Sequence, residues 1–252
     1  DPFARLTARR SVLAWATTED TARQLSQMGA KNVKVLSQVA LLPEEIARLS
    51  QSYISSDRPV RFISIGRLLH WKGFHLGLRA FAQADLPSDA EYWIVGDGPE
   101  RKRLQILAQE LGIISQVMFC PEMSRERIWQ MMADARALIH PSLHESGGFV
   151  CLEAMAAGRP VVCLDLGGPA VQVTEATGFK VPAIEPQQAV AGIADAMSRL
   201  ANDAELSAEL GKAGQKRANE LFNWANKGQQ LVQCYDNILN RQTIPHAYSH
   251  SS

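Results

Sequence analysis

Apolar positions follow two alternating patterns from Arg58 onward. Short runs of β-branched and apolar residues, typical of buried strands, are separated by longer stretches with helical spacing. The predicted strands are Val60–Ile65, Tyr92–Val95, Val117–Phe119, Ala137–His140 and Val161–Leu164, and the predicted helices are Phe74–Ala84, Glu100–Leu111, Arg125–Ala133 and Phe149–Ala157. Strands and helices that alternate with short connections predict an α/β fold, in which a Rossmann-like parallel sheet carries helices on both faces.

The residues before this alternation have a different pattern. They predict a strand at Ser11–Ala16, a helix from Thr17 to Met28, a strand at Val33–Leu36 and a linker near Leu41–Asp57. We interpret residues 1–57 as the end of a preceding domain followed by its linker, and residues 58–222 as the Rossmann-like domain.

The last part of the chain is predicted to be helical from Pro186 to Asn240, with breaks near Asn202 and at Phe222. Asn223 precedes Trp224 as an N-cap residue would precede a helix. Residues 223–240 are therefore predicted as one terminal helix. The polar residues 241–252 have no periodicity and are expected to form a loose tail.

Composition excludes several classes of partner. The chain has 252 residues, of which 46% are hydrophobic and 21% charged, as in ordinary soluble domains. Lys+Arg and Asp+Glu number 26 each, so no overall field attracts nucleic acid or an anionic membrane. The mainly apolar runs are too short for a membrane span, which needs roughly 20 residues. Four scattered cysteines without a C-x-x-C pair favour buried free thiols in the cytoplasm.

The first chemical motif follows the predicted strand Val60–Ile65 and reads Gly66-Arg67-Leu68-Leu69-His70-Trp71-Lys72-Gly73. Ligands of open parallel sheets bind beyond the carboxyl ends of the strands, so this loop would face a ligand. Gly66 lets the backbone approach closely, while Arg67 and Lys72 supply a planar fork and a point charge that suit a diphosphate. Taken alone, the motif is equally consistent with two cations that extend into solvent.

A second motif, Val95-Gly96-Asp97-Gly98-Pro99-Glu100, begins like a dinucleotide-binding fingerprint. Arg101 stands where that fingerprint requires a third glycine. Pro99 suits the first turn of the helix that follows. The motif therefore indicates a tight strand-to-helix turn that lines a pocket at Gly96, and only weakly an NAD site.

The third motif is the most specific and runs from His140 to Pro160, HPSLHESGGFVCLEAMAAGRP. A strand ends in a glycine loop, and a helix of small residues follows. Free amides at the start of that helix would bind an anion, and sugar hydroxyls could donate to the flanking carboxylates of Glu145 and Glu153. Each glutamate alone would more often be a solvated surface residue, but both beside a glycine loop favour a binding site. The amides concerned belong to Gly148, Phe149 and Val150, and Gly147 just before them is also a candidate binding residue.

Nearby histidines do not form a metal motif. His144-Glu145 is not an H-E-x-x-H sequence, because Gly148 occupies the place of the second histidine. His140 and His144 are four residues apart, but Pro141 prevents them from sharing a helical face. No metal ligand and no cofactor is predicted.

The order of these motifs closely resembles that of family-four retaining glycosyltransferases with the GT-B fold. The resemblance covers about residues 58–240 and includes Gly167-Gly168, Thr177-Gly178 and Phe222-Asn223-Trp224. It implies that the chain contains the C-terminal, donor-binding domain of such an enzyme. It also implies that Ser11–Leu42 is the last strand and helix of the N-terminal domain.

The resemblance further implies a role for each site residue. Arg67 and Lys72 would bind the donor diphosphate, Glu153 the ribose hydroxyls and Glu145 the transferred sugar. The base would lie near residues 119–123, where the chain reads Phe119-Cys120-Pro121-Glu122 and lacks the glycine that usually follows the strand.

The expected function is transfer of a sugar from a UDP or GDP sugar to a sugar, lipid-linked or other glycan acceptor. The resemblance implies same-face, retaining attack without a divalent metal. We expect a cytoplasmic enzyme, peripheral at the membrane at most, whose activity requires the rest of the N-terminal domain. Two alternatives remain open: a nucleotide-sugar-binding domain or subunit without transfer activity of its own, and an α/β oxidoreductase, against which Arg101 counts.

Overall fold

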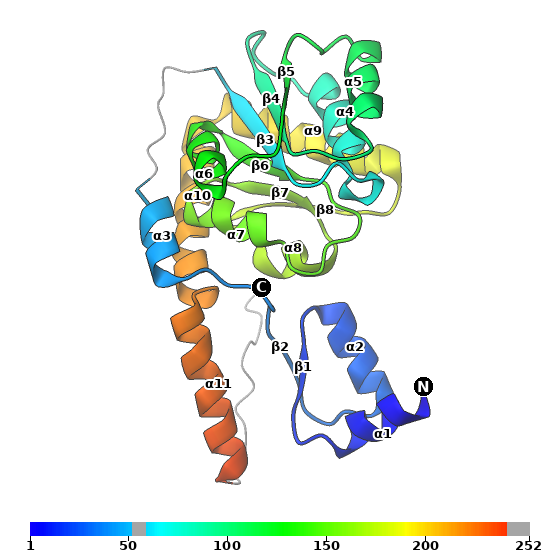
Figure 1. The fold of residues 1–252 in the computed structure, drawn as a ribbon, viewed down its shortest axis with the longest axis vertical. Helices are drawn as coiled ribbons and strands as arrows, with labels where there is room; N and C mark the ends of the chain where they lie inside the picture. Colours follow the sequence, from blue (N-terminus) through cyan, green and yellow to red (C-terminus); the bar gives the residue numbers. More distant parts are fainter. Residues whose placement is uncertain (52–58, 241–252) are drawn as a thin grey trace.

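The computed structural model describes residues 1–51 and 59–240. The predicted linker residues 52–57 and the predicted tail 241–252 lie outside these ranges. The first elements form a small unit in which the parallel strands β1 (Ala14–Ala16) and β2 (Val33–Val35) pair beside helices α1 (Pro2–Arg10) and α2 (Glu19–Met28). Figure 1 shows this unit on one side of the larger sheet, with β2 leading toward it.

The main body is the parallel α/β sheet that the hydrophobic pattern predicts. Its strand order is β5-β4-β3-β6-β7-β8, and every pairing is parallel. The strands are β3 (Arg61–Ile65), β4 (Glu91–Val95), β5 (Val117–Cys120), β6 (Ala137–His140), β7 (Val161–Leu164) and β8 (Gly178–Val181). Five of these were predicted within two residues. β8 was missed, because a four-residue strand containing Gly178 and Lys180 carries little strand signal.

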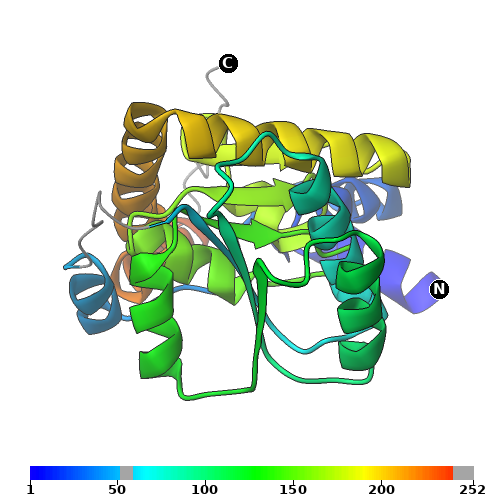
Figure 2. The same ribbon diagram turned by 90° about the horizontal axis from the view of Figure 1, so that it is seen from above.

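Helices cover both faces of the sheet, as predicted. One core joins the sheet to α4 (Phe74–Gln83), α5 (Arg101–Glu110) and α9 (Pro186–Asn202). The opposite core joins it to α3 (Pro43–Leu49), α6 (Arg125–Asp134), α7 (Phe149–Ala156) and the end of α10 (Ala204–Leu221). Alternate residues of one strand supply the two cores: Phe62 faces the first and Ile63 the second. Seen from above, α9 runs along its own face of the sheet (Figure 2).

The terminal helix α11 (Trp224–Leu239) begins where the pattern predicts. The Asn223 side chain accepts a hydrogen bond from the Ala225 amide at 2.9 Å, which confirms the predicted N-cap. The break near Asn202 is also confirmed, because Asp203 caps α10 through the Leu206 amide at 2.8 Å. Figure 1 shows α11 extending away from the sheet, toward the side on which β1 and β2 lie.

The predicted linker contains a helix that the sequence analysis missed. In α3, Pro43 occupies the first turn and the Glu45 carboxylate caps the Leu42 amide at 2.8 Å. Just before α3, the Leu41 amide donates to Phe222 O at 2.8 Å, and the Trp224 amide donates to Leu41 O at 3.0 Å. The segment that leads into the main sheet is therefore fixed to the start of α11.

Two further properties concern the cysteines and the length of the helices. All four cysteines are buried and free, as predicted. Within residues 1–51 and 59–240, no helix combines the length and apolar character that crossing a bilayer requires.

Candidate functional site

The strand order places a topological switch point between β3 and β6. The chain proceeds from β3 to β4 on one side and from β6 to β7 on the other, so the loops that follow β3 and β6 diverge. Such a switch point, at the carboxyl ends of parallel strands, is where ligands of open α/β sheets bind. The first and third motifs, residues 66–73 and 140–148, are the loops on either side of it.

The loop after β3 is joined to the loop after β4 by backbone hydrogen bonds. The Gly66 amide donates to Val95 O at 3.0 Å, and the Leu68 amide donates to Asp97 O at 2.8 Å. Gly96 has φ 138°, and a Cβ there would lie 2.0 Å from Gly66 O. A glycine is thus required at position 96 so that the two loops can meet, whatever contact it also makes with a ligand.

The loop after β3 also packs on the loop after β6. Gly73 has φ 69°, and a Cβ there would lie 1.9 Å from Pro141 O. The Leu143 amide donates to Trp71 O at 2.8 Å. These contacts bring Lys72, on the first loop, to Glu145, on the second.

Lys72 and Glu145 form a half-buried ion pair at this switch point, with 2.5 Å between Nζ and Oε2. The other carboxylate oxygen, Oε1, accepts hydrogen bonds from the Gly147 and Gly148 amides at 3.3 and 3.2 Å. His140 Nε2 lies 3.6 Å from Oε2 and has no hydrogen-bond partner in the described ranges. His140, Lys72 and the Gly148 amide hold the pKa of Glu145 well below its usual range, against the opposing effect of burial.

The glycine loop leads into the N-terminus of α7, as predicted. Gly148 has φ 68° and caps the helix, so the first-turn amides of Phe149 and Val150 have no intrahelical acceptor. Helix α8 (Gly167–Gln172) donates two hydrogen bonds to this loop. The Gly168 amide donates to Glu145 O at 2.9 Å, and Gln172 Nε2 donates to Gly147 O at 2.5 Å.

Helix α8 was missed as a helix, although its Gly167-Gly168 pair was noticed. A Cβ at Gly167 would lie 2.1 Å from Glu145 O, and one at Gly168 would lie 2.5 Å from Ser146 O. The glycine pair is therefore explained by the close approach of α8 to the backbone of residues 145–147.

Glu153 lies one turn inside α7 and is 5% exposed. Its Oε1 accepts hydrogen bonds from Arg125 Nε at 2.6 Å and from Trp129 Nε1 at 2.8 Å, both on α6. Arg125 also pairs with Glu45 of α3. Sequence reasoning missed these three partners, because no local motif signals contacts between α3, α6 and α7.

Arg67 lies on the same loop as Lys72 but is exposed and forms no ion pair with the described residues. The structure therefore gathers all ten predicted residues on the carboxyl edge of the sheet or on α7. They are Gly66, Arg67, Lys72, Gly96, Glu145, Gly147, Gly148, Phe149, Val150 and Glu153. Their individual roles toward a ligand stay predictions.

Arg101, which replaces the third glycine of a dinucleotide fingerprint, fills the space beside the predicted base region. Its guanidinium donates to Gly96 O at 3.1 Å and to Phe119 O at 3.0 Å. The long side chain of Arg101 therefore occupies space that the dinucleotide fingerprint keeps free by requiring a glycine.

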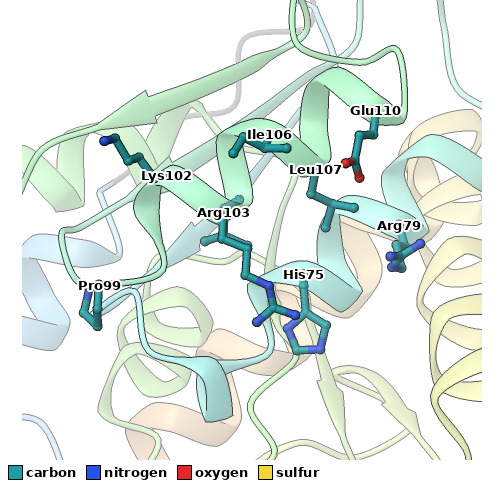
Figure 3. A pocket seen from close by; sticks show the side chains of 9 residues that line it. His75, Arg79, Pro99, Lys102, Arg103, Ile106, Leu107 and Glu110 are labelled. Carbon is teal, nitrogen blue, oxygen red and sulfur yellow. The ribbon is translucent and has the colours of Figure 1, made fainter.

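A concavity lies outside this site, between α4 and α5 (Figure 3). It has a volume of about 540 Å³, and its polar lining includes His75, Arg79, Lys102, Arg103 and Glu110. None of the ten predicted residues lines it.

Comparison with known proteins agrees with the motifs. Residues 45–217 match the family model of glycosyl transferases group 1. The chain is 28% identical to an alpha-D-kanosaminyltransferase of Streptomyces kanamyceticus, over 94% of this chain and 64% of that protein. It is 30% identical to a 2-deoxystreptamine glucosyltransferase of the same organism, over 79% and 51% respectively. The chain thus spans between half and two thirds of these relatives.

Solved structures share the fold. Anabaena Alr3699/HepE, crystallised in complex with UDP, is 25% identical with a TM-score of 0.75, over 93% of this chain and 66% of that one. The predicted Rossmann-like, C-terminal GT-B architecture is therefore confirmed. Given the match over residues 45–217, this chain belongs to the group 1 glycosyltransferases.

Proposed function

We propose that this chain binds a UDP or GDP sugar at the switch point between β3 and β6 and supplies the donor half of a retaining glycosyltransferase. One observation carries the proposal. The loop that carries the cationic Arg67 and Lys72 and the amide end of α7 lie on opposite sides of a topological switch point, where Lys72 reaches Glu145. A diphosphate is the anion that such an arrangement suits best.

The donor phosphates would replace the Glu145 carboxylate as partner of Lys72 and of the α7 amides. Glu145 then turns toward the transferred sugar, whose hydroxyls donate to it. Breaking the bond between the sugar C1 and the phosphate oxygen leaves a nucleoside diphosphate with growing negative charge. Arg67, Lys72 and the helix amides stabilise that charge by fixed electrostatics, without a metal or a cofactor.

In the retaining reaction, the acceptor hydroxyl oxygen bonds to C1 on the face that the phosphate leaves, and its proton passes to the leaving phosphate. Glu145 and Glu153 do not act as the nucleophile and acid of a retaining glycosidase. Glu153 instead accepts hydrogen bonds from the ribose hydroxyls through Oε2, since both of its protein partners donate to Oε1.

The acceptor, a sugar or a lipid-linked or other glycan, would bind on a facing N-terminal domain, of which β1, α2 and β2 form the last elements. The four buried free thiols favour a reducing compartment, and we propose the cytoplasm. The alternative is a nucleotide-sugar-binding domain without transfer activity of its own.

A thermal-shift screen of UDP and GDP sugars tests binding, and sugar transfer is then assayed with residues 1–252 and with a form extended by an acceptor-side domain. We expect stabilisation by one nucleotide family, negligible transfer by residues 1–252, and transfer by the extended form. Binding without transfer by either form would favour the alternative. A screen in which no nucleotide sugar raises the melting temperature would contradict both.

A further inference from the structure

Glu153, the carboxylate that we assign to the ribose, is held by two linked ion pairs. They connect it through Arg125 to Glu45 of the linker helix α3. Arg125 Nε donates to Glu153 Oε1 at 2.6 Å, and another nitrogen of the same guanidinium, Nη1, pairs with Glu45 of α3. The third, Nη2, is buried without a hydrogen-bond partner in the described part of the chain. Arg125 therefore divides its planar fork between two acidic side chains that are 108 positions apart (153 − 45).

Aromatic rings fix the position of this guanidinium. Its central carbon lies 4.8 Å from the ring centroid of Trp129 and 4.8 Å from that of Phe149. Trp129 also donates to the same oxygen of Glu153 at 2.8 Å. Phe149 is the first residue of α7, at the amide end that would face the donor. Arg125 is thus held between the Glu153 carboxylate, which we assign to the ribose, and Phe149 at the predicted nucleotide site.

Such an arrangement has a physical reason. Glu153 is 5% exposed, and a buried carboxylate is costly unless charged or polar donors surround it. Both donors reach Oε1, and this fixes the direction in which Oε2 points. A lysine could supply the charge but not the planar fork that serves two carboxylates at once.

Glu45 connects this group to the linker. Its Oε2 caps the Leu42 amide at 2.8 Å, while its Oε1 contacts Arg125. Leu41, one residue earlier, is joined to the start of α11 by two backbone hydrogen bonds. The position of Arg125 is thus set by the segment that joins the small N-terminal unit to the sheet.

We propose that Arg125 is a positioning residue for ribose recognition, and that Glu45 of the linker helix fixes Arg125, so that the linker tunes nucleotide affinity. This inference rests on the proposed function. In it, Arg125 orients the Glu153 carboxylate toward the ribose, and α3 contributes to the donor site through Glu45.

Isothermal titration calorimetry with UDP, GDP and their 2′,3′-dideoxy analogues tests the proposal on purified residues 1–252. Glu45→Gln keeps the shape of the side chain and removes its charge. Glu44→Gln is the matched control, because Glu44 is the neighbouring exposed carboxylate on the same helix. Arg125→Lys keeps the charge and removes the fork, and circular dichroism confirms that each variant is folded.

We expect Arg125→Lys to weaken the natural diphosphate on the order of tenfold, the size of a lost charge-assisted hydrogen bond, and Glu45→Gln to weaken it severalfold. The dideoxy analogue should bind each variant as it binds the wild type, and Glu44→Gln should change neither affinity. Equal losses for the natural and dideoxy ligands, or unchanged binding of the natural ligand, would overturn the proposal. Wild-type protein that binds no nucleotide would instead refute the proposed function itself.

Discussion

Glu145 lies between Lys72 and the amide end of α7, and one carboxylate contacts both: Oε2 is 2.5 Å from Lys72 Nζ, and Oε1 accepts from the Gly147 and Gly148 amides. These are the groups that we assign to the donor phosphates. An acidic side chain therefore occupies the proposed phosphate site and compensates its positive charge.

Replacing Glu145 by alanine should separate bare nucleotide from nucleotide sugar. Removal of the carboxylate frees Lys72 and the helix amides, so UDP or GDP should bind as tightly as before or severalfold more tightly. The nucleotide sugar loses a charge-assisted hydrogen bond to the sugar, which is worth roughly 1.5–3 kcal/mol. Titration with both ligands checks this. The dissociation constant of the nucleotide sugar, divided by that of the bare nucleotide, should rise on the order of tenfold. An unchanged ratio would show that Glu145 does not contact the sugar.

Gly96→Ala should destabilise the fold, because a Cβ at this position would lie 2.0 Å from Gly66 O on a backbone with φ 138°. The strained conformation alone costs on the order of 1–3 kcal/mol, and the clash adds to it. Gly228→Ala is the control: it lies inside the exposed part of α11 with nothing within 4 Å of its would-be Cβ. Alanine there should stabilise the helix by roughly 0.5–1 kcal/mol. Urea denaturation measures both, and two changes of the same sign would refute this explanation of the motif.

Lys227 predicts a pH dependence of stability at alkaline pH. The ammonium is buried, donates to the carbonyls of Ser37 and Val39, and has no carboxylate partner among its described contacts. Burial lowers the pKa of Lys227 from 10.5 to about 8. The unfolded chain therefore binds more protons than the folded one between pH 8 and 10.5, so this residue's contribution to stability rises with pH across that window and is lost as the pH falls back to 8.

Lys227→Met removes this titration and nearly preserves the length of the side chain. The free energy of unfolding of the wild type relative to Lys227→Met should rise by at most about 3 kcal/mol from pH 8 to 10.5, at 1.36 kcal/mol for each pKa unit. Urea titrations of both proteins at several pH values measure the difference, in which the ionisation of other groups cancels. A difference that stays constant would show that the lysine ionises normally.

The parts of the fold that could be predicted are those that local sequence specifies. Five strands and the loops at Gly66, Gly96 and Gly148 carry their own signals, because buried runs and left-handed glycines are recognisable within a few residues. Helix α1 carried a signal that was overlooked, since Asp1 accepts a hydrogen bond from the Phe3 amide and Pro2 starts the helix. By contrast, β8 forms by pairing with β7, a contact between separate segments that no local pattern shows.

The sequence indicated residues that the structure brings to one edge of the sheet, but it did not indicate the contacts between them; their membership of a ligand site stays a prediction. Glu145 and Glu153 were chosen because they flank a glycine loop, and that spacing is local. The pairing of Arg125 with Glu45 joins residues 80 positions apart and depends on how α3 lies beside α6. Such a contact follows from tertiary packing, so a single sequence cannot indicate it.

Calorimetric titration of Arg67→Ala with UDP and GDP in EDTA tests the central claim most directly. Arg67 is exposed and forms no ion pair with the described residues, so its removal should not disturb the fold. Arg79→Ala is the matched control, because Arg79 is an exposed arginine that lines the concavity between α4 and α5. The proposed site predicts that wild type binds one of the nucleotides without metal, that Arg67→Ala weakens it on the order of tenfold, and that Arg79→Ala leaves it unchanged. Binding that requires added magnesium or manganese, or a loss with Arg79→Ala and none with Arg67→Ala, would contradict it.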